Sequence, residues 1–397
     1  MQDAKIINKK ISYLLWLFVF LLFYISADTS LFATDSATLF GRVFSIFLLG
    51  SAVTAILLSL KSPHYKYLGT FGVIFLSFVI TIIINNSFSG GFILQLSLYI
   101  IAIFIVERIP FYKFCVYYEK LVFFFACCSI LFYLLRLLSL DYPGIFIVHA
   151  DNIYHHNLFS SYLTYSSSII RNFSIFREPG VYAIYLNFAI LINILSSKKN
   201  NIKLLIFYTA LITTFSTTGV IVGILLLVLK FNSLGKKSTV LSLLLVGIII
   251  VIIGFDRVFI SEYIDTTFGK FSVNSDSFNS TLARITSIFV PLKIFFENPL
   301  GVGFENFIEY YTETSHKLFN IWVTPGMATN TITNMFAKFG FIGIFTPIWV
   351  YRLANLFSSK SISMWLILLV IVICFSSQDL WASSIFTIFL IYGMKNG

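Results

Sequence analysis

Long apolar runs recur along the whole chain and constrain its fold more than any other feature. Segments such as LLWLFVFLLFYI and VGIIIVIIG carry no charge, and the runs reach about 15 to 25 residues, enough for a helix to cross a ~30 Å hydrocarbon core. The ~10-residue alternating strands of a membrane barrel would not produce such runs. Charged residues make up only 11% of the chain, against about 25% in soluble domains. We therefore expect an all-α polytopic membrane protein that forms a single integral membrane domain over residues 1–397.

Hydropathy and the distribution of lysine and arginine together predict about 12 transmembrane helices with both termini in the cytoplasm. Lys5, Lys9 and Lys10 precede the first helix and orient it, because basic residues collect on the cytoplasmic side. The net charge of +10 is then a topology signal, and we expect no nucleic-acid partner. The expected spans are 11–27, 41–60, 68–85, 91–106, 117–140, 179–197, two within 202–231, 238–255, 330–352, 362–379 and 380–394.

The number of membrane crossings in segment 202–231 decides the topology of the second half. The segment is too long for one straight helix and short for two. A single crossing would place Lys236 and Lys237 outside. Two crossings, with a break at the polar residues 216–219, keep both lysines inside. We prefer two short helices. Residues 141–178 and 256–329 then become two long external loops, and long ordered loops are usually functional.

Both external loops contain arginines, on the face where the positive-inside rule disfavours them. A guanidinium offers a planar fork of donors that suits phosphate oxygens. Arg177 and Glu178 immediately precede Pro179, which suits the first position of a helix, and a helix N-terminus attracts anions. We expect Arg177 to bind phosphate and Glu178 to orient it or to act as a base. The alternative is an arginine that reaches lipid headgroups, with Glu178 stabilising the helix start.

The second loop holds Arg284 in an amphipathic stretch, where an unpaired charge beside the membrane needs a partner or a ligand. Further along, Pro299, Gly301 and Gly303 predict a rigid turn with a close approach of the backbone. A purely structural turn explains the glycines. It explains less readily why polar residues such as Glu305 crowd around them.

The histidines, cysteines and aromatic residues do not predict a metal or cofactor site. His155 and His156 are adjacent and would point apart, so we interpret them, with His149, as solvated loop histidines. The four cysteines lack a C-x-x-C spacing and are interpreted as packing residues. Aromatic side chains of the first loop could stack on sugar rings or form an interfacial belt. These aromatic residues are Tyr154, Phe159, Tyr162 and Tyr165.

Four motifs, in this order and spacing, resemble those of the O-antigen and capsular polysaccharide polymerases of the Wzy type and of the related O-antigen ligases. They are FREPG with Arg177, STLARITS with Arg284, the turn NPLGVGFENF, and ATNTITNMFAKFGFIG. The motifs cover residues 170–345, and the topology resembles that family over the whole chain.

The resemblance implies a metal-independent glycosyltransferase of the bacterial inner membrane with its site on the periplasmic face. Donor and acceptor would be glycans on undecaprenyl diphosphate, whose diphosphate Arg177 and Arg284 would hold, assisted by Arg171. Membrane lipids and a chain-length regulator protein are the further partners expected. The loop-shaping residues would be Pro299, Gly301, Gly303 and Asn330.

The last motif departs from the ligase pattern in one position. Ligases carry His, then Asn, Ser or Gln, nine residues, Gly, two residues and Gly. Here Thr329 and Asn330 precede Gly340 and Gly343 at the right spacing, but the histidine is missing. This favours a polymerase over a ligase and leaves the general base open. The candidates for the base are Glu178, Glu305 and His316.

Two rival functions from other classes remain at this stage. A polysaccharide flippase would place ionisable residues within the membrane, and Glu119, Lys120 and Arg136 in one apolar run keep that alternative open. A polytopic receptor or scaffold would have no affinity for diphosphate.

Overall fold

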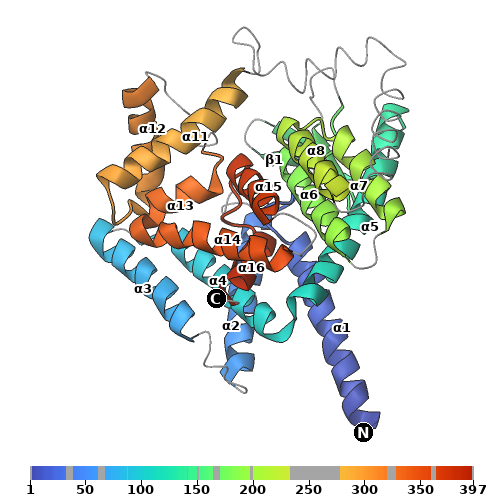
Figure 1. Ribbon diagram of the computed structural model, residues 1–397, viewed down its shortest axis with the longest axis horizontal. Coiled ribbons are helices and arrows are strands. Elements are labelled where there is room, and N and C mark those ends of the chain that lie inside the picture. Colours follow the sequence, from blue (N-terminus) through green and yellow to red (C-terminus); the bar gives the residue numbers. More distant parts are fainter. Residues whose placement is uncertain are drawn as a thin grey trace.

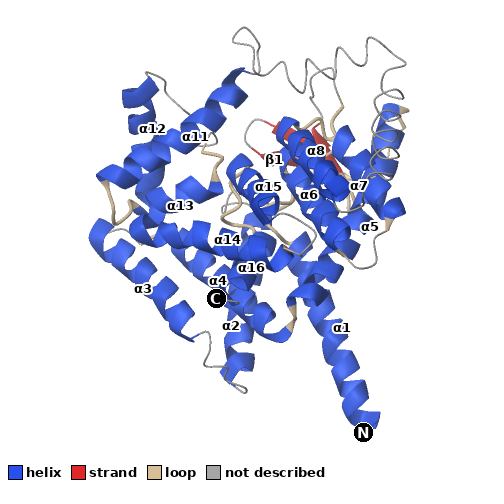
Figure 2. Cartoon of the chain, viewed as in Figure 1, coloured by secondary structure: helices blue, strands red, loops and turns tan. Residues whose placement is uncertain are grey.

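The chain is mostly helical in the computed structural model, which describes residues 2–32, 39–60, 68–86, 88–140, 142–149, 152–163, 170–196, 200–232, 278–319, 328–358 and 364–395 (Figures 1 and 2). The first half contains α1 (Gln2–Tyr24), α2 (Leu39–Leu60), α3 (Leu68–Asn85), α4 (Gly90–Arg108), α5 (Phe111–Leu137), α6 (Pro179–Leu195), α7 (Asn201–Thr213) and α8 (Thr217–Asn232). The second half contains α11 (Phe278–Glu297), α12 (Gly303–Phe319), α13 (Thr331–Phe339), α14 (Phe345–Phe357), α15 (Met364–Ser377) and α16 (Ser384–Lys395).

Apolar helices dominate the described part of the chain, as expected for a membrane protein. Three of them, α2, α4 and α5, are long and apolar enough to cross a membrane. Seven shorter apolar helices accompany them, namely parts of α1, α3 and α8 and the whole of α6, α7, α15 and α16. The predicted span 238–255 lies outside the described residues.

The predicted break within 202–231 is confirmed. The helix α7 ends at Thr213 and α8 begins at Thr217, so the two form a hairpin. The far ends of the hairpin also meet, because Lys230 Nζ donates a hydrogen bond to Asn201 Oδ1 at 3.2 Å.

The single helix predicted over 330–352 is wrong, because the chain there forms α13, a 3₁₀ helix η4 (Gly340–Ile344) and α14. The physical reason is a contact with the turn that joins α11 to α12. Gly340 has φ +61° and Gly301 has φ +82°, and each glycine lies against the backbone of the other turn. The turns are joined by hydrogen bonds from Val302 N to Ala337 O and from Phe341 N to Pro299 O, both 2.9 Å.

The two long loops are more structured than the sequence indicated. In 141–178 an antiparallel sheet of order β1-β2-β3 forms from β1 (Ile145–His149), β2 (Asn152–His156) and β3 (Ser161–Leu163), so the fold is not wholly α. Successive side chains of a strand point to opposite faces of the sheet. Ile147 and Tyr154 are buried in a small cluster with Phe173. In 256–329 the described residues 278–319 form α11 and α12, which pack with α13.

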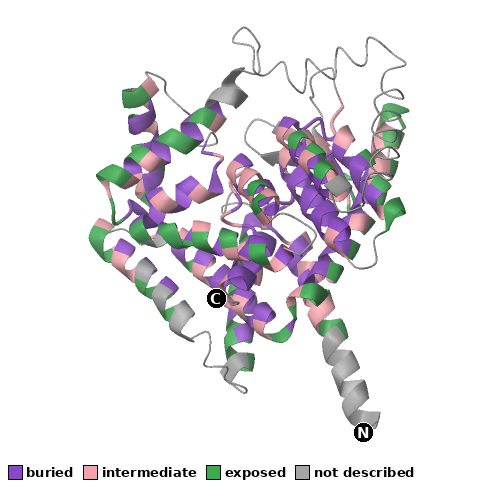
Figure 3. Cartoon of the chain, viewed as in Figure 1, coloured by how far each residue is buried: buried purple, intermediate pink, exposed green. Residues whose placement is uncertain are grey.

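The helix α6 is buried along nearly its whole length, with every residue from Val181 to Ile194 buried. Figure 3 shows the buried residues of the fold in purple. The helix α6 contacts α5, α7 and α8, and its aromatic side chains pack against those of α16. Near its end, Asn193 donates to Glu119 Oε1 at 2.8 Å, and Lys203 Nζ lies 3.2 Å from the same oxygen. Arg136 lies 4.1 Å above the ring of Tyr162. Glu119 and Arg136, two of the three charged residues that had left a flippase as an alternative, therefore have partners within the protein.

Helix ends gather at two opposite ends of the bundle. At one end the segment after α1 joins the segment before α6, through Ser30 N to Ile175 O (2.9 Å) and Arg177 N to Asp28 O (2.9 Å). At the other end Tyr392 OH donates to Ile109 O at 2.6 Å, and Lys395 Nζ donates to Val106 O at 2.8 Å. Two segments predicted to be external thus contact each other, and two segments predicted to be cytoplasmic do the same.

Replacing Gly301 by alanine should lower the free energy of unfolding by at least about 2 kcal/mol. The left-handed φ disfavours a side chain, and its Cβ would lie 2.5 Å from Lys338 O. Gly50→Ala is the control, because nothing lies within 4 Å of that Cβ position, and it should be neutral or stabilise by up to about 1 kcal/mol. Thermal unfolding in detergent, followed by size-exclusion chromatography, measures both. Equal midpoints for the two variants would contradict the packing described here.

Candidate functional site

Arg177 and Glu178 form a junction where the ends of α1, α6 and α15 meet. The Arg177 guanidinium lies 3.5 Å from Glu178 Oε1 and donates to the carbonyl of Asp379 at 3.0 Å. Gln378 Nε2 donates to Glu178 Oε2 at 3.2 Å. Pro179 begins α6, as predicted, but the Glu178 side chain makes no capping hydrogen bond. Arg177 is engaged within the protein, which does not favour the alternative of a side chain that reaches lipid headgroups.

The electrostatic surroundings of Arg177 are rich in carboxylates. Burial disfavours its charged form, but Glu178, Asp28 and Asp379 outweigh this and hold the pKa of Arg177 above its ordinary value. Asp28 is buried and accepts a hydrogen bond of 2.5 Å from Tyr185 OH. Burial raises the pKa of Asp28, and Arg177 opposes that shift.

The charges of Glu178 and Arg284 affect the pKa of Arg171, the third arginine predicted for the site. Its Nε and one Nη donate hydrogen bonds to the carbonyls of Thr214 and Phe215 at 3.1 Å each, so the Arg171 side chain caps the C-terminus of α7. Burial lowers the pKa of Arg171 to about 10, with Glu178 opposing the shift and Arg284 adding to it. Arg177 contacts Glu178 directly, and Gln378, which donates to Glu178, also lines a pocket with Arg284.

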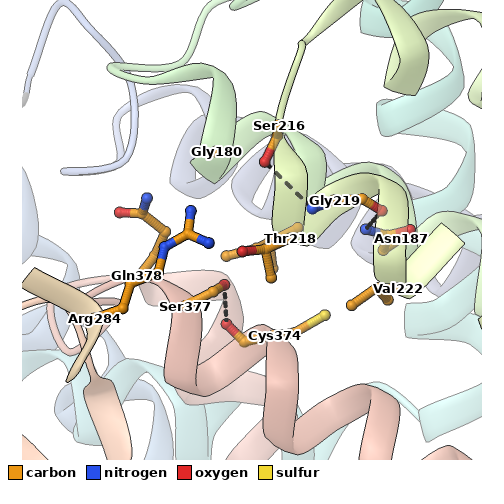
Figure 4. A pocket seen from close by; sticks show the side chains of 11 residues that line it. Gly180, Asn187, Ser216, Thr218, Gly219, Val222, Arg284, Cys374, Ser377 and Gln378 are labelled. Carbon is orange, nitrogen blue, oxygen red and sulfur yellow. Dashed lines mark hydrogen bonds between the residues drawn. The ribbon is translucent and has the colours of Figure 1, made fainter. Parts of the chain in front are cut away.

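Arg284 lines a small pocket between α6, α8 and α15 (Figure 4). Arg284 and Gln378 lie on one side of it, and Thr218 lies across from them. Burial lowers the pKa of Arg284. The remaining lining residues are Gly180, Ile184, Asn187, Ser216, Gly219, Val222, Cys374 and Ser377. Polar side chains come from α6 (Asn187), α8 (Thr218) and α15 (Ser377) as well as from Arg284 and Gln378, so the lining is mixed.

A second charged pair, which the sequence analysis missed, lies beside the junction. Lys338 is 5% exposed, its Nζ lies 3.9 Å from Asp379 Oδ2, and Asn334 donates to the same oxygen at 3.3 Å. Three rings surround the ammonium at 4.8 to 5.2 Å from their centroids, those of Phe304, Phe307 and Trp381. The spacing of Asn334 and Lys338, one helical turn apart, was the only signal in the sequence.

The other two candidate bases lie on α12, next to α11 and away from α6 (Figure 1). Glu305 is exposed in the first turn of α12, and His316 lies in its last turn. Glu178, in contrast, contacts Arg177 directly. Asn330 caps α13 by accepting hydrogen bonds from the amides of Ile332 and Thr333.

Two of the three histidines of the first loop, His155 and His156, are not solvated as predicted, whereas the side chain of His149 lies outside the described part of the structure. His155 and His156 are buried, because β2 packs against the segment after α1 and against aromatic rings. His156 Nδ1 lies 2.9 Å from Ser30 Oγ, and the His155 ring lies 4.8 Å from that of Tyr162. Tyr154 is also buried, so it offers no face to a sugar, and Tyr165 lies outside the described residues. Within the described ranges no three His, Cys, Asp or Glu side chains are grouped to hold a metal ion.

Comparison with known proteins yields no relative. The chain matches no family model, no curated protein and no solved structure.

His156 should make the protein less stable in mild acid. Burial, reinforced by His155, lowers the pKa of His156 to about 4, against about 6.5 in an unfolded chain. Between these values the unfolded state binds the proton first, so stability falls as the pH falls, by up to about 3 kcal/mol. Unfolding midpoints at pH 7.5 and 5 should differ more in the wild type than in His156→Gln. The half-exposed His316→Gln is the control, and an equal pH dependence in His156→Gln and the wild type would refute the assignment.

Proposed function

We propose that the protein is a membrane glycosyltransferase that polymerises undecaprenyl-diphosphate-linked oligosaccharide repeat units into O-antigen or a related surface polysaccharide. The observation that carries this proposal is that Arg177 pairs with Glu178, and that Gln378, which donates to Glu178, lines the same pocket as Arg284. The resemblance to Wzy-type polymerases supplies the substrate class. In this proposal the site faces the periplasm, about 12 helices cross the inner membrane, and both termini are cytoplasmic.

The chemistry requires stabilisation of a leaving diphosphate. The acceptor hydroxyl attacks the anomeric carbon of the donor glycan, the bond from that carbon to the diphosphate oxygen breaks, and the diphosphate leaves with the electron pair. Guanidinium groups held in a partly buried site stabilise the charge that develops on that oxygen. The hydroxyl proton passes to a general base, for which Glu178 is the best placed of the three candidates because it adjoins the arginines.

A ligase is the second candidate, with the same donor chemistry and a different acceptor. The position where ligases carry histidine is Thr329, whose hydroxyl lies 3.4 Å from Ser287 Oγ on α11, the helix that carries Arg284. A base at this position would adjoin the arginine site, and this chain has none there. A flippase is less favoured, because Glu119 and Lys203 pair with each other.

Replacing Arg284 by alanine should lower polymer formation roughly ten- to a hundredfold, because a lost charged contact costs about 1.5 to 3 kcal/mol. Arg177→Ala should lower it at least as much, and Arg177→Lys should restore little, since an ammonium lacks the planar fork. The assay incubates purified protein with a lipid-linked repeat unit and resolves the ladder of products. Lys293→Ala is the control, because Lys293 lies on the same helix and pairs with Glu297 at the surface. Wild-type ladders from both arginine variants would refute the diphosphate role.

Deleting the gene should distinguish polymerase from ligase. If the protein polymerises, the deletion strain should carry one repeat unit on its final acceptor, because a separate ligase still transfers the single unit. Complementation with Thr329→Ala should restore full-length polymer. An acceptor without any repeat unit, together with full-length polymer on the lipid carrier, would identify the protein as the ligase.

A further inference from the structure

The turn between α15 and α16, residues 378–381, is held by one face of α13. That face carries Thr331, Asn334 and Lys338, which are three and four residues apart and therefore lie on one side of the helix. All three side chains contact the turn. Thr331 hydrogen-bonds to its backbone, and Asn334 and Lys338 contact the carboxylate of Asp379. The position of the turn therefore depends on α13.

The same turn holds the two charged residues of the candidate site. The carbonyl of Asp379 accepts a hydrogen bond from Arg177 at 3.0 Å, and the side chain of Gln378 donates one to Glu178 at 3.2 Å. Arg177 and Glu178 themselves lie 3.5 Å apart. A shift of the turn on α13 would therefore change the orientation of both groups.

Arg177 has three carboxylates near it, and they compete for one guanidinium. The charges of Glu178, Asp28 and Asp379 all act on it. Arg177 contacts Asp379 through the backbone carbonyl, whereas the carboxylate of Asp379 lies against α13, with its Oδ2 3.9 Å from Lys338 Nζ. Lys338 thus takes up a carboxylate that would otherwise compete with Glu178 for Arg177.

Stability alone does not account for a lysine at this position. Lys338 is buried, so its ammonium has lost most of its hydration, and the rings of Phe304, Phe307 and Trp381 surround it. A buried ion pair typically stabilises a fold no more than well-packed apolar side chains of similar size would. The pair is better explained by the direction that it gives to the Asp379 carboxylate.

We propose that Lys338 is a positioning residue of the candidate site, which acts through Asp379. It holds the Asp379 carboxylate on α13, and Arg177 thereby stays paired with Glu178. The inference rests on the proposed function, in which Glu178 accepts the hydroxyl proton. Because Lys338 is buried beneath aromatic rings, it does this without touching the substrate.

The experiment compares variants of the full chain in the polymerisation assay and in thermal unfolding in detergent. Lys338→Met removes the charge and nearly keeps the length of the side chain among the rings. Asp379→Asn removes the opposite charge and keeps the carbonyl that Arg177 contacts. A double variant carries both changes. Lys317→Met, alone and with Glu313→Gln, is the matched control, because that pair lies on the surface of α12.

Lys338→Met should lower kcat roughly ten- to a hundredfold with little change in KM for the donor, because the released carboxylate displaces Glu178 from Arg177. Asp379→Asn should cause a smaller loss, since no carboxylate is left to compete. Adding Asp379→Asn to Lys338→Met should raise kcat again, to the level of Asp379→Asn alone. Both Lys317 controls should keep the wild-type kcat.

The unfolding midpoints test the same contacts without any activity. Lys338→Met leaves the Asp379 carboxylate without its counter-ion, so the midpoint should fall, and Asp379→Asn should restore it. Arg177 is then the remaining cation beside that carboxylate. Arg177→Gln should therefore lower the midpoint more in Lys338→Met than in the wild type. This excess loss should disappear when Asp379→Asn is also present.

Two kinetic outcomes would overturn the inference. One is a wild-type kcat in folded Lys338→Met. The other is a double variant whose kcat stays well below that of Asp379→Asn alone, which also decides the matter if Lys338→Met does not fold by itself. A raised KM in Lys338→Met that Asp379→Asn does not reverse would place Lys338 on the donor instead and would equally overturn it.

Failure of the proposed function has a different signature. No polymer from the wild type would refute that function, and the midpoints would then decide the role of Lys338. An equal loss from Arg177→Gln in the wild type and in Lys338→Met would show that Lys338 does not keep the Asp379 carboxylate from Arg177.

Discussion

The guanidinium and the backbone amide of Arg177 hydrogen-bond to segments at the ends of several helices, and the position of the candidate site depends on these contacts. They join the segment after α1, the start of α6 and the turn between α15 and α16, which are separated by more than a hundred residues in sequence. Because α6 is buried along its length, its position is set by packing, and the Arg177 contacts fix which neighbouring turns lie against its first residues. Gln378, held by Glu178, then faces the pocket from the same turn.

Local features of the sequence predicted much of the helical framework. Pro179 marked the start of α6, since its fixed φ suits a first helical position. The polar residues 216–219 marked the break in the hairpin of α7 and α8, which in the structure lies slightly earlier, between Thr213 and Thr217. The arginines were singled out because the predicted topology places them outside, where basic residues are uncommon beside a membrane. Each of these signals is contained in a few consecutive residues.

What the sequence did not predict depends on contacts between distant segments. The break after α13 arises because Gly340 packs against the turn at Gly301, and either glycine alone is an ordinary turn or helix residue. Lys338 finds its aromatic surroundings on α12 and beside α16, and His156 finds its partner after α1. The different environments of Arg177 and Arg284 likewise depend on which carboxylates the fold brings near, which composition and spacing do not encode.

Two of the helices that line the pocket are short. The helix α8 has 16 residues and α15 has 14, which corresponds to lengths of about 24 and about 21 Å at ~1.5 Å per residue. A typical hydrocarbon core is ~30 Å thick. In the proposed topology the bilayer must therefore thin beside these helices, or the protein must carry polar groups below the usual headgroup level. A lipid-linked substrate would then meet Arg284 without its tail being drawn out of the membrane.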